Sequence, residues 1–162
     1  NVRFLSKAEI RRYPMFGWLS SASGTLFIER GKGSESSSAL ITEVLRQGHN
    51  VLIFPEATTS DGISVKPFHP RLFKSAIAAQ KPVTPLMISY LTNHQPNRDI
   101  AWTLDRGFMH TLWHIAGSWR TEVQVHCFAP ISSDGLSRKE LAKRCHLQIR
   151  GLLESQISQR PS

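Results

Sequence analysis

A short apolar segment that stops abruptly at a proline is the feature that most constrains this chain. Residues 51–54 are Val-Leu-Ile-Phe, with β-branched side chains at Val51 and Ile53, and Pro55 and Glu56 follow directly. A short apolar run that ends in a turn signal is typical of a strand buried in a parallel sheet. Strand ends in α/β sheets often present functional groups. The segment therefore predicts Glu56 at a ligand-binding edge, although a surface acid after a core strand has the same pattern.

A second strand and a helix precede this segment and complete a βαβ unit. Residues 25–29 are largely apolar, and Arg30 stands at their end before a glycine-rich loop. The intervening residues predict a helix, with its cap, apolar face and stop at Ser36–Ser38, Leu40, Ile41, Val44, Leu45 and Gly48. Strand, helix and strand within about 30 residues imply neighbouring parallel strands. Arg30 and Glu56 should then line one cleft, where Arg30 suits phosphate or carboxylate; a solvated arginine is the alternative.

The rest of the chain predicts an α/β fold, with a mixed, mainly parallel sheet flanked by helices. A second crossover helix begins at Pro70 and ends before Pro82. Residues 83–90 then form a third buried strand, with Pro85 near its start. Residues 122–128 alternate polar and apolar side chains, which predicts a half-exposed strand near the sheet edge.

Length and charge limit the classes of function. A chain of 162 residues predicts a single domain over residues 1–162, and no apolar run reaches the roughly 18 residues that cross a bilayer. The net charge is +8, and the first 33 residues hold six basic and two acidic side chains. This balance favours nucleic acid, an anionic membrane face, or a phosphorylated or CoA-like substrate. The first residue is Asn1 rather than Met, which is typical of a fragment or a processed product.

The two cysteines point to no metal site. Cys127 and Cys145 form no CxxC motif and have no histidine at metal-ligand spacing. We expect ordinary thiols in a reducing compartment, with a structural disulfide as the alternative.

The N-terminal residues combine a helix signal with a membrane-interface composition. Ser6 to Glu9 matches a capping box, which predicts a short helix from Lys7. Basic and large apolar side chains then lie close together in the sequence as far as Trp18, and they include Arg11, Arg12, Met15 and Phe16. This mixture is common in segments that lie on anionic membranes, although the same aromatic residues could be core.

Three blocks in order carry a resemblance to the glycerolipid acyltransferases of the lysophosphatidic acid acyltransferase family. Residues 24–30, Gly-Thr-Leu-Phe-Ile-Glu-Arg, resemble the family's G-x-x-F-I-x-R block. Residues 54–60, Phe-Pro-Glu-Ala-Thr-Thr-Ser, are similar to its F-P-E-G-T-R-S block, and residues 83–85 to its V-x-P block. The resemblance covers roughly residues 4–130.

The resemblance implies a site that this chain holds only in part. Arg30 would bind the anionic head group of the acceptor, Glu56 to Thr59 would position the acceptor, and Pro85 would shape the pocket wall. The family's catalytic His and Asp lie in an N-H-x4-D block, which is expected upstream of Asn1. No catalytic residue is therefore expected in this chain, and the chain alone should be inactive.

Two substitutions in the second block point to one branch of the family. Ala57 stands where the family has Gly, and Thr59 stands where it has Arg. This variant resembles the lyso-ornithine lipid acyltransferases, so the acceptor is either a lyso-ornithine lipid or 1-acylglycerol-3-phosphate.

A literal N-H-x4-D match, from Asn93 to Asp99, is predicted to be a decoy. It follows the third block instead of preceding the first, and Pro96 disfavours the helical turn that the motif needs. Seven histidines in 162 residues also make a chance match unsurprising. His69, near Glu56, is the best other candidate for a base, but the sequence offers it no evident orienting carboxylate.

The implied reaction is acyl transfer from acyl-CoA or acyl-carrier protein to a lysolipid hydroxyl, with the upstream His as general base. It needs no metal or redox cofactor, and it would take place at the cytoplasmic face of a membrane. The alternatives are a non-catalytic lipid-binding homologue and a basic nucleic-acid-binding module. The second is disfavoured because the basic residues are dispersed and no nucleic-acid motif is present.

Overall fold

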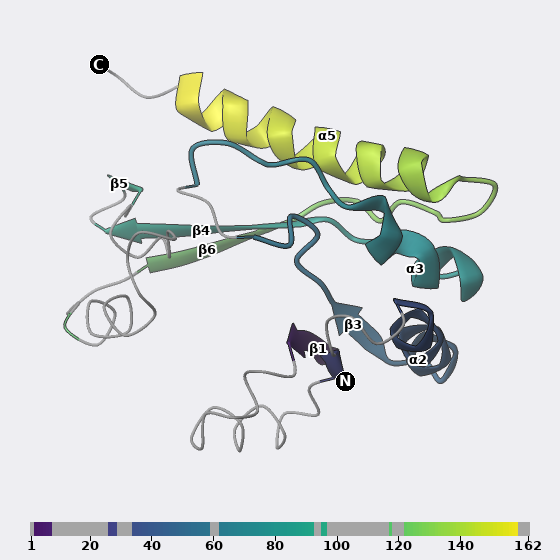
Figure 1. The fold of residues 1–162 in the computed structure, drawn as a ribbon. Coiled ribbons are helices and arrows are strands. Elements are labelled where there is room, and N and C mark those ends of the chain that lie inside the picture. Colours follow the sequence, from purple (N-terminus) through teal and green to yellow (C-terminus); the bar gives the residue numbers. More distant parts are fainter. Residues whose placement is uncertain are drawn as a thin grey trace. The chain divides into compact units, whose positions relative to one another are not determined.

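The computed structural model of the chain describes residues 2–7, 26–28, 34–58, 62–92, 95–96, 117 and 122–158. Its contacts divide the chain into two compact units, which are described separately. Its helices and strands are labelled along the ribbon in Figure 1. The first unit comprises Asn1–Pro55, Pro70–Pro82 and Ser132–Arg138, and the second comprises Glu56–His69, Val83–Ile131 and Lys139–Ser162. A single domain over residues 1–162 stays a prediction.

The first unit contains a parallel sheet of three described strands. They are β1 (Val2–Lys7), β2 (Leu26–Ile28) and β3 (Asn50–Leu52), in the order β2-β1-β3. Leu5 to Lys7 of β1 pair with β2, and Val2 to Phe4 pair with β3. The two predicted strands are therefore parallel, but the prediction that they are neighbours is wrong, because β1 takes the place between them.

The helix predicted from Lys7 is wrong at its first residue. Lys7 belongs to β1 and pairs with Ile28. A capping box is a local signal worth about 1 kcal/mol, and pairing on both sides of β1 outweighs it. The rest of the predicted membrane segment, Lys7 to Trp18, lies outside the described residues.

The helix predicted between the two strands is confirmed as α2 (Ser34–Arg46), which begins before the predicted cap. Ile41 and Val44 are buried, as its apolar face predicts, whereas Leu40 is exposed. Gly48 ends the helix with φ +83°, a conformation that glycine adopts without strain, and the His49 N–H donates to Val44 O.

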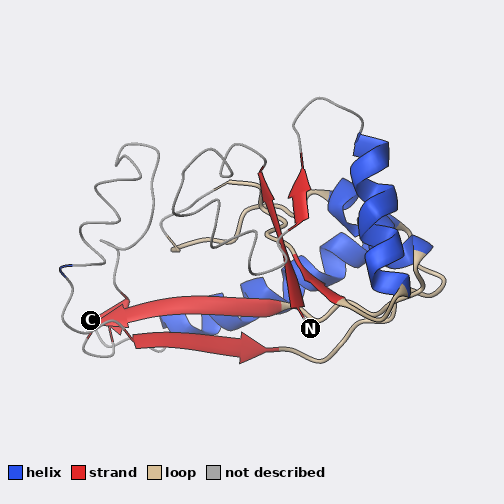
Figure 2. Cartoon of the chain, turned by 90° about the horizontal axis from the view of Figure 1, so that it is seen from below, coloured by secondary structure: helices blue, strands red, loops and turns tan. Residues whose placement is uncertain are grey.

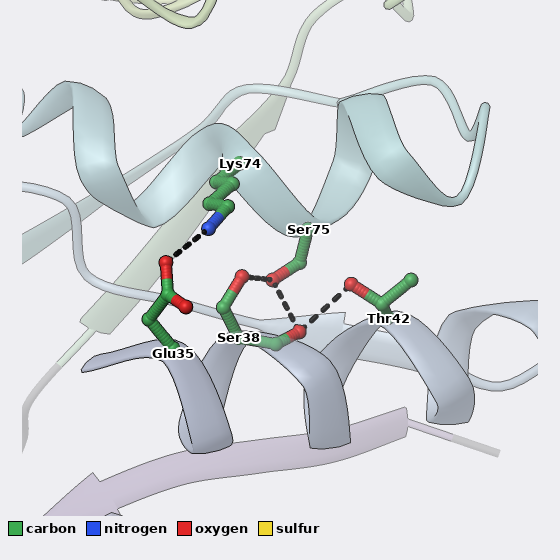
Figure 3. Close-up of polar contacts among 5 residues, drawn as sticks. All are labelled: Glu35, Ser38, Thr42, Lys74 and Ser75. Carbon is green, nitrogen blue, oxygen red and sulfur yellow. Dashed lines mark hydrogen bonds and ion pairs between the residues drawn. The ribbon is translucent and has the colours of Figure 1, made fainter. Parts of the chain in front are cut away.

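The helix predicted from Pro70 is also confirmed, but it is not a crossover within one sheet, because β3 and β4 belong to different sheets. A short 3-10 helix, Pro70–Phe73, leads into α3 (Lys74–Ala78). Hydroxyl groups fasten α3 to α2 (Figure 3). Ser75 is buried and its Oγ donates to Ser38 O at 3.0 Å, so the 3.1 Å contact between the two hydroxyls has Ser38 Oγ as its donor. Lys74 and Glu35 add an exposed ion pair of 3.1 Å. The Ser38 hydroxyl therefore joins two helices instead of capping one.

The second unit contains an antiparallel sheet. Its described strands are β4 (Leu86–Thr92), β5 (Gln95–Pro96) and β6 (Glu122–Cys127), in the order β5-β4-β6. Figure 2 shows β4 and β6 as long arrows that run in opposite directions. The predicted strands at 83–90 and 122–128 are confirmed, the first with a start shifted to Leu86. The α/β class is confirmed as well, but the described parallel and antiparallel strands belong to two sheets rather than to one mixed sheet.

A long helix, α5 (Arg138–Ser158), completes the second unit. Its buried residues recur at helical spacing and form one face: Leu141, Ala142, Cys145 and Ile149. Gln156 Nε2 lies 3.5 Å from His126 Nε2 on β6. None of the helices that the structure describes combines the length and the hydropathy of a membrane span.

Candidate functional site

The loop after β3 carries the central acidic residue. β3 ends at Leu52, and Val51 to Ile53 are only half-buried, so the apolar run is less enclosed than predicted. Phe54 is 63% exposed. Pro55 and Glu56 form a turn, and Glu56 is half-buried. The carboxylate that follows β3 in the sequence is thus partly shielded, and its place at a ligand-binding edge stays a prediction.

Ala57 has an unusual backbone conformation. Its φ is +54°, in the left-handed region, which costs an L-residue with a Cβ about 1–2 kcal/mol. Glycine adopts this conformation freely. The turn therefore accounts for a glycine at this position in the block that residues 54–60 resemble, and Ala57 keeps the turn at the cost of strain.

The carboxylate of Glu56 is fixed by the backbone of its own loop. Glu56 Oε2 accepts a hydrogen bond of 2.9 Å from the Lys66 N–H. A backbone donor to a carboxylate is a charge-assisted bond, which is stronger than a neutral one. This bond closes the loop between residues 56 and 66 and restricts the direction in which the carboxylate faces.

Helix α5 also contacts the loop that carries Glu56, through His146. His146 Nε2 lies 3.2 Å from Val65 O. The rings of His146 and Phe68 meet edge to face, with centroids 5.3 Å apart and planes at 85°. The sequence carries no signal for these contacts, because His146 is a single histidine on an amphipathic helix and Val65 O is a backbone group of the kind that every residue has.

Pro85 is buried just before β4. Its carbonyl accepts the Phe128 N–H at 3.0 Å, and two backbone bonds join Val83 to Ile131 nearby, at 2.9 and 2.8 Å. Pro85 thus lies in a segment joined by backbone hydrogen bonds at the start of the antiparallel sheet.

The remaining predicted site residues are only partly described. Thr58 is exposed on the Glu56 loop, and so is His69. Arg30 and Thr59 lie outside the described residues, so a cleft shared by Arg30 and Glu56 stays a prediction. Within the described ranges, no three His, Cys, Asp or Glu side chains gather as metal ligands.

The decoy motif lies partly in β5. Gln95 and Pro96 are extended and pair with Thr92 and Leu91 of β4. The prediction that Pro96 prevents a helical turn is therefore confirmed at these two residues, while His94 and Asp99 lie outside the described part of the chain.

The two thiols are free and differ in environment. Cys127 is exposed and Cys145 is buried. Burial raises the pKa of Cys145 to about 11, so its thiol is protonated at neutral pH and is a poor nucleophile. The predicted ordinary thiols are confirmed, and the alternative of a disulfide between them is not seen.

The fold is that of a solved lipid acyltransferase. The crystal structure of the 1-acyl-sn-glycerophosphate (LPA) acyltransferase PlsC from Thermotoga maritima superposes with a TM-score of 0.65. The match covers 99% of this chain and 58% of that one, at 22% sequence identity. A family model described as Acyltransferase matches residues 1–89, and the chain belongs to this family.

The chain is similar in sequence to two kinds of acyltransferase. The lyso-ornithine lipid O-acyltransferase of Pseudomonas aeruginosa is 40% identical over 150 residues, which are 92% of this chain and 58% of that protein. The 1-acyl-sn-glycerol-3-phosphate acyltransferase of Neisseria gonorrhoeae is 32% identical over 124 residues, which are 75% of this chain and 49% of that protein. The chain thus spans somewhat over half the length of its first relative.

Proposed function

We propose that the protein to which this chain belongs transfers an acyl group to the hydroxyl of a lysolipid. The observation that carries this proposal is the half-buried Glu56 carboxylate, fixed after β3 in a chain that belongs to the acyltransferase family. The acyl donor would be acyl-CoA or acyl-carrier protein, and neither a metal nor a redox cofactor takes part. The reaction would take place at the cytoplasmic face of a membrane, with the basic N-terminal segment toward anionic lipid.

The residues of this chain would bind and orient the acceptor. Among the described residues, the Lys66 N–H is the one hydrogen-bond donor to Glu56, and it takes Oε2. Oε1 can then accept a bond from an acceptor hydroxyl or amine. Thr58 and Thr59 would add hydroxyl contacts, Arg30 would bind an anionic group, and Pro85 would form part of the wall. The catalytic His and Asp would come from an N-H-x4-D block that precedes Asn1, with the His as general base.

The acceptor we favour is a lyso-ornithine lipid. The identity is 40% to a relative with that name and 32% to one named for 1-acyl-sn-glycerol-3-phosphate. The residues support the same choice, because Thr59 replaces an arginine suited to phosphate, and Glu56 offers a negative charge to a head group that carries an amine.

The test compares acceptors in a form of the protein that includes the N-H-x4-D block. We expect a kcat/KM for lyso-ornithine lipid at least roughly tenfold above that for lysophosphatidate, equivalent to about 1.4 kcal/mol. Thr59→Arg should narrow the ratio by improving turnover of the phosphate acceptor. Faster turnover of lysophosphatidate by the unmodified protein would reverse the assignment. Binding of both lipids without turnover would support the non-catalytic homologue.

A further inference from the structure

One peptide group connects His146 to Glu56. The Val65 carbonyl lies 3.2 Å from His146 Nε2, and the Lys66 N–H, on the other side of the same peptide bond, donates to Glu56 Oε2 at 2.9 Å. A carbonyl oxygen can only accept, so the His146 ring must carry a proton on Nε2. The three groups thus form a continuous chain of hydrogen bonds, from His146 through the peptide to Glu56.

We propose that His146 is a positioning residue for the Glu56 carboxylate. It acts through the Val65–Lys66 peptide and does not touch the substrate. This inference rests on the proposed function, since it assigns His146 a part in holding the acceptor that Glu56 binds.

The ring of His146 is held by its surroundings. Its neighbour Cys145 is 1% exposed, so the buried face of α5 fixes the helix position at this point. The edge-to-face contact with Phe68 fixes the ring plane. Both ring contacts are to residues 65–68 of the loop, so the side chain grips the segment that donates to Glu56. A rigid donor on a long helix can locate a loop more accurately than the loop's own backbone can.

The hydrogen bond from His146 should strengthen the hydrogen bond that holds the Glu56 carboxylate. A donor at the Val65 carbonyl polarises the peptide and makes the Lys66 N–H a stronger donor, because linked hydrogen bonds reinforce one another. Removal of the His146 donor should weaken the bond to Glu56 and let the carboxylate sample other directions. The acceptor would then bind less well, while the acyl donor, which Glu56 is not proposed to hold, would be unaffected.

The kinetic test uses a form of the protein that includes the N-H-x4-D block. We expect His146→Leu to raise the KM for the lysolipid roughly three- to tenfold, as befits one net hydrogen bond, with the KM for the acyl donor unchanged. His146→Gln should recover most of the loss, because its amide can donate to Val65 O. His126→Leu is the matched control: it makes the same change on β6, where His126 faces Gln156 instead of the loop, and should leave both KM values unchanged.

The spectroscopic test does not depend on turnover, so it remains informative if the proposed function is wrong. In NMR spectra of the wild-type protein, the chemical shifts of the ring nitrogens should identify His146 as the Nε2–H tautomer. The Lys66 amide proton should resonate downfield because it binds a carboxylate. Glu56→Gln and His146→Leu should both move this proton upfield, and His126→Leu should not. If His146→Leu leaves the Lys66 proton in place, or if His146→Gln is as impaired as His146→Leu, the positioning role is refuted.

Discussion

Glu56 and Ala57, on one loop, each have a structural explanation that the sequence alone does not supply. The sequence indicates that Glu56 is exposed after a strand, but it gives no sign that a backbone amide ten residues later fixes the carboxylate. It also shows that Ala57 departs from a family pattern without showing why glycine suits the position. The φ of +54° supplies the reason. The sequence therefore marks Glu56 as a candidate, but it does not show the interactions that orient the side chain, because they come from the backbone of a loop.

The strain at Ala57 leads to a prediction at the residue scale. Ala57→Gly should leave the protein as stable or raise its free energy of unfolding by up to about 1 kcal/mol, since relief of the left-handed strain exceeds the added entropy of the unfolded chain. Ala78→Gly, at the end of α3, is the control and should cost roughly 0.5–1 kcal/mol, because its conformation is helical. Urea unfolding measures both. A loss of stability in Ala57→Gly as large as in the control would show that Ala57 is not strained.

At the scale of elements, periodicity was the reliable signal. It predicted α2, a helix after Pro70, and strands β3, β4 and β6, with ends shifted by a few residues. It missed β1, because Val2–Lys7 has a weak alternation and a capping box at its end. It also could not give strand order, which depends on a strand that no local pattern marked. Pairing between distant segments decided the sheet, and such pairing leaves little trace in either partner.

The contact between α2 and α3 leads to a prediction at this scale. Ser75→Ala should lower the free energy of unfolding by about 1–2 kcal/mol, because the Ser75 hydroxyl is buried and bonds to the hydroxyl and the carbonyl of Ser38. Glu35→Ala removes a neighbouring ion pair whose carboxylate side is 87% exposed, and it should cost less than about 0.5 kcal/mol. Chemical denaturation of both variants provides the comparison. Equal losses would mean that the hydroxyl contacts do not hold the two helices together.

At the scale of the whole molecule, composition and the ordered sequence blocks were sufficient to predict the α/β fold class and the acyltransferase family. The family model covers residues 1–89, and a solved acyltransferase shares the fold over 99% of the chain. The division into a unit with a parallel sheet and a unit with an antiparallel sheet was not predictable. The apolar run of β4 suits either kind of sheet, and the alternation of β6 indicates a half-exposed strand without showing which strand it pairs with. Pairing of β4 with β6, in register from Leu86↔Cys127 to Leu91↔Glu122, makes them antiparallel.

The central proposal is that this chain positions an acceptor while the general base lies in the N-H-x4-D block, outside residues 1–162. Glu56 is accordingly proposed to bind the acceptor, and the His of the N-H-x4-D block to act as the general base. The other described candidate, His69, is exposed on the same loop. The decoy at residues 93–99 contributes an extended Gln95–Pro96 pair in place of a helical turn.

The most direct measurement is acyl turnover by residues 1–162 alone, compared with a form extended to include the N-H-x4-D block. Both are supplied with acyl-CoA or acyl-carrier protein and with lyso-ornithine lipid or lysophosphatidate. We predict turnover by the extended form only. His94→Ala should leave the turnover of the extended form unchanged. Turnover by residues 1–162 that His94→Ala abolishes would contradict the account and place the base in the motif assigned here as a decoy.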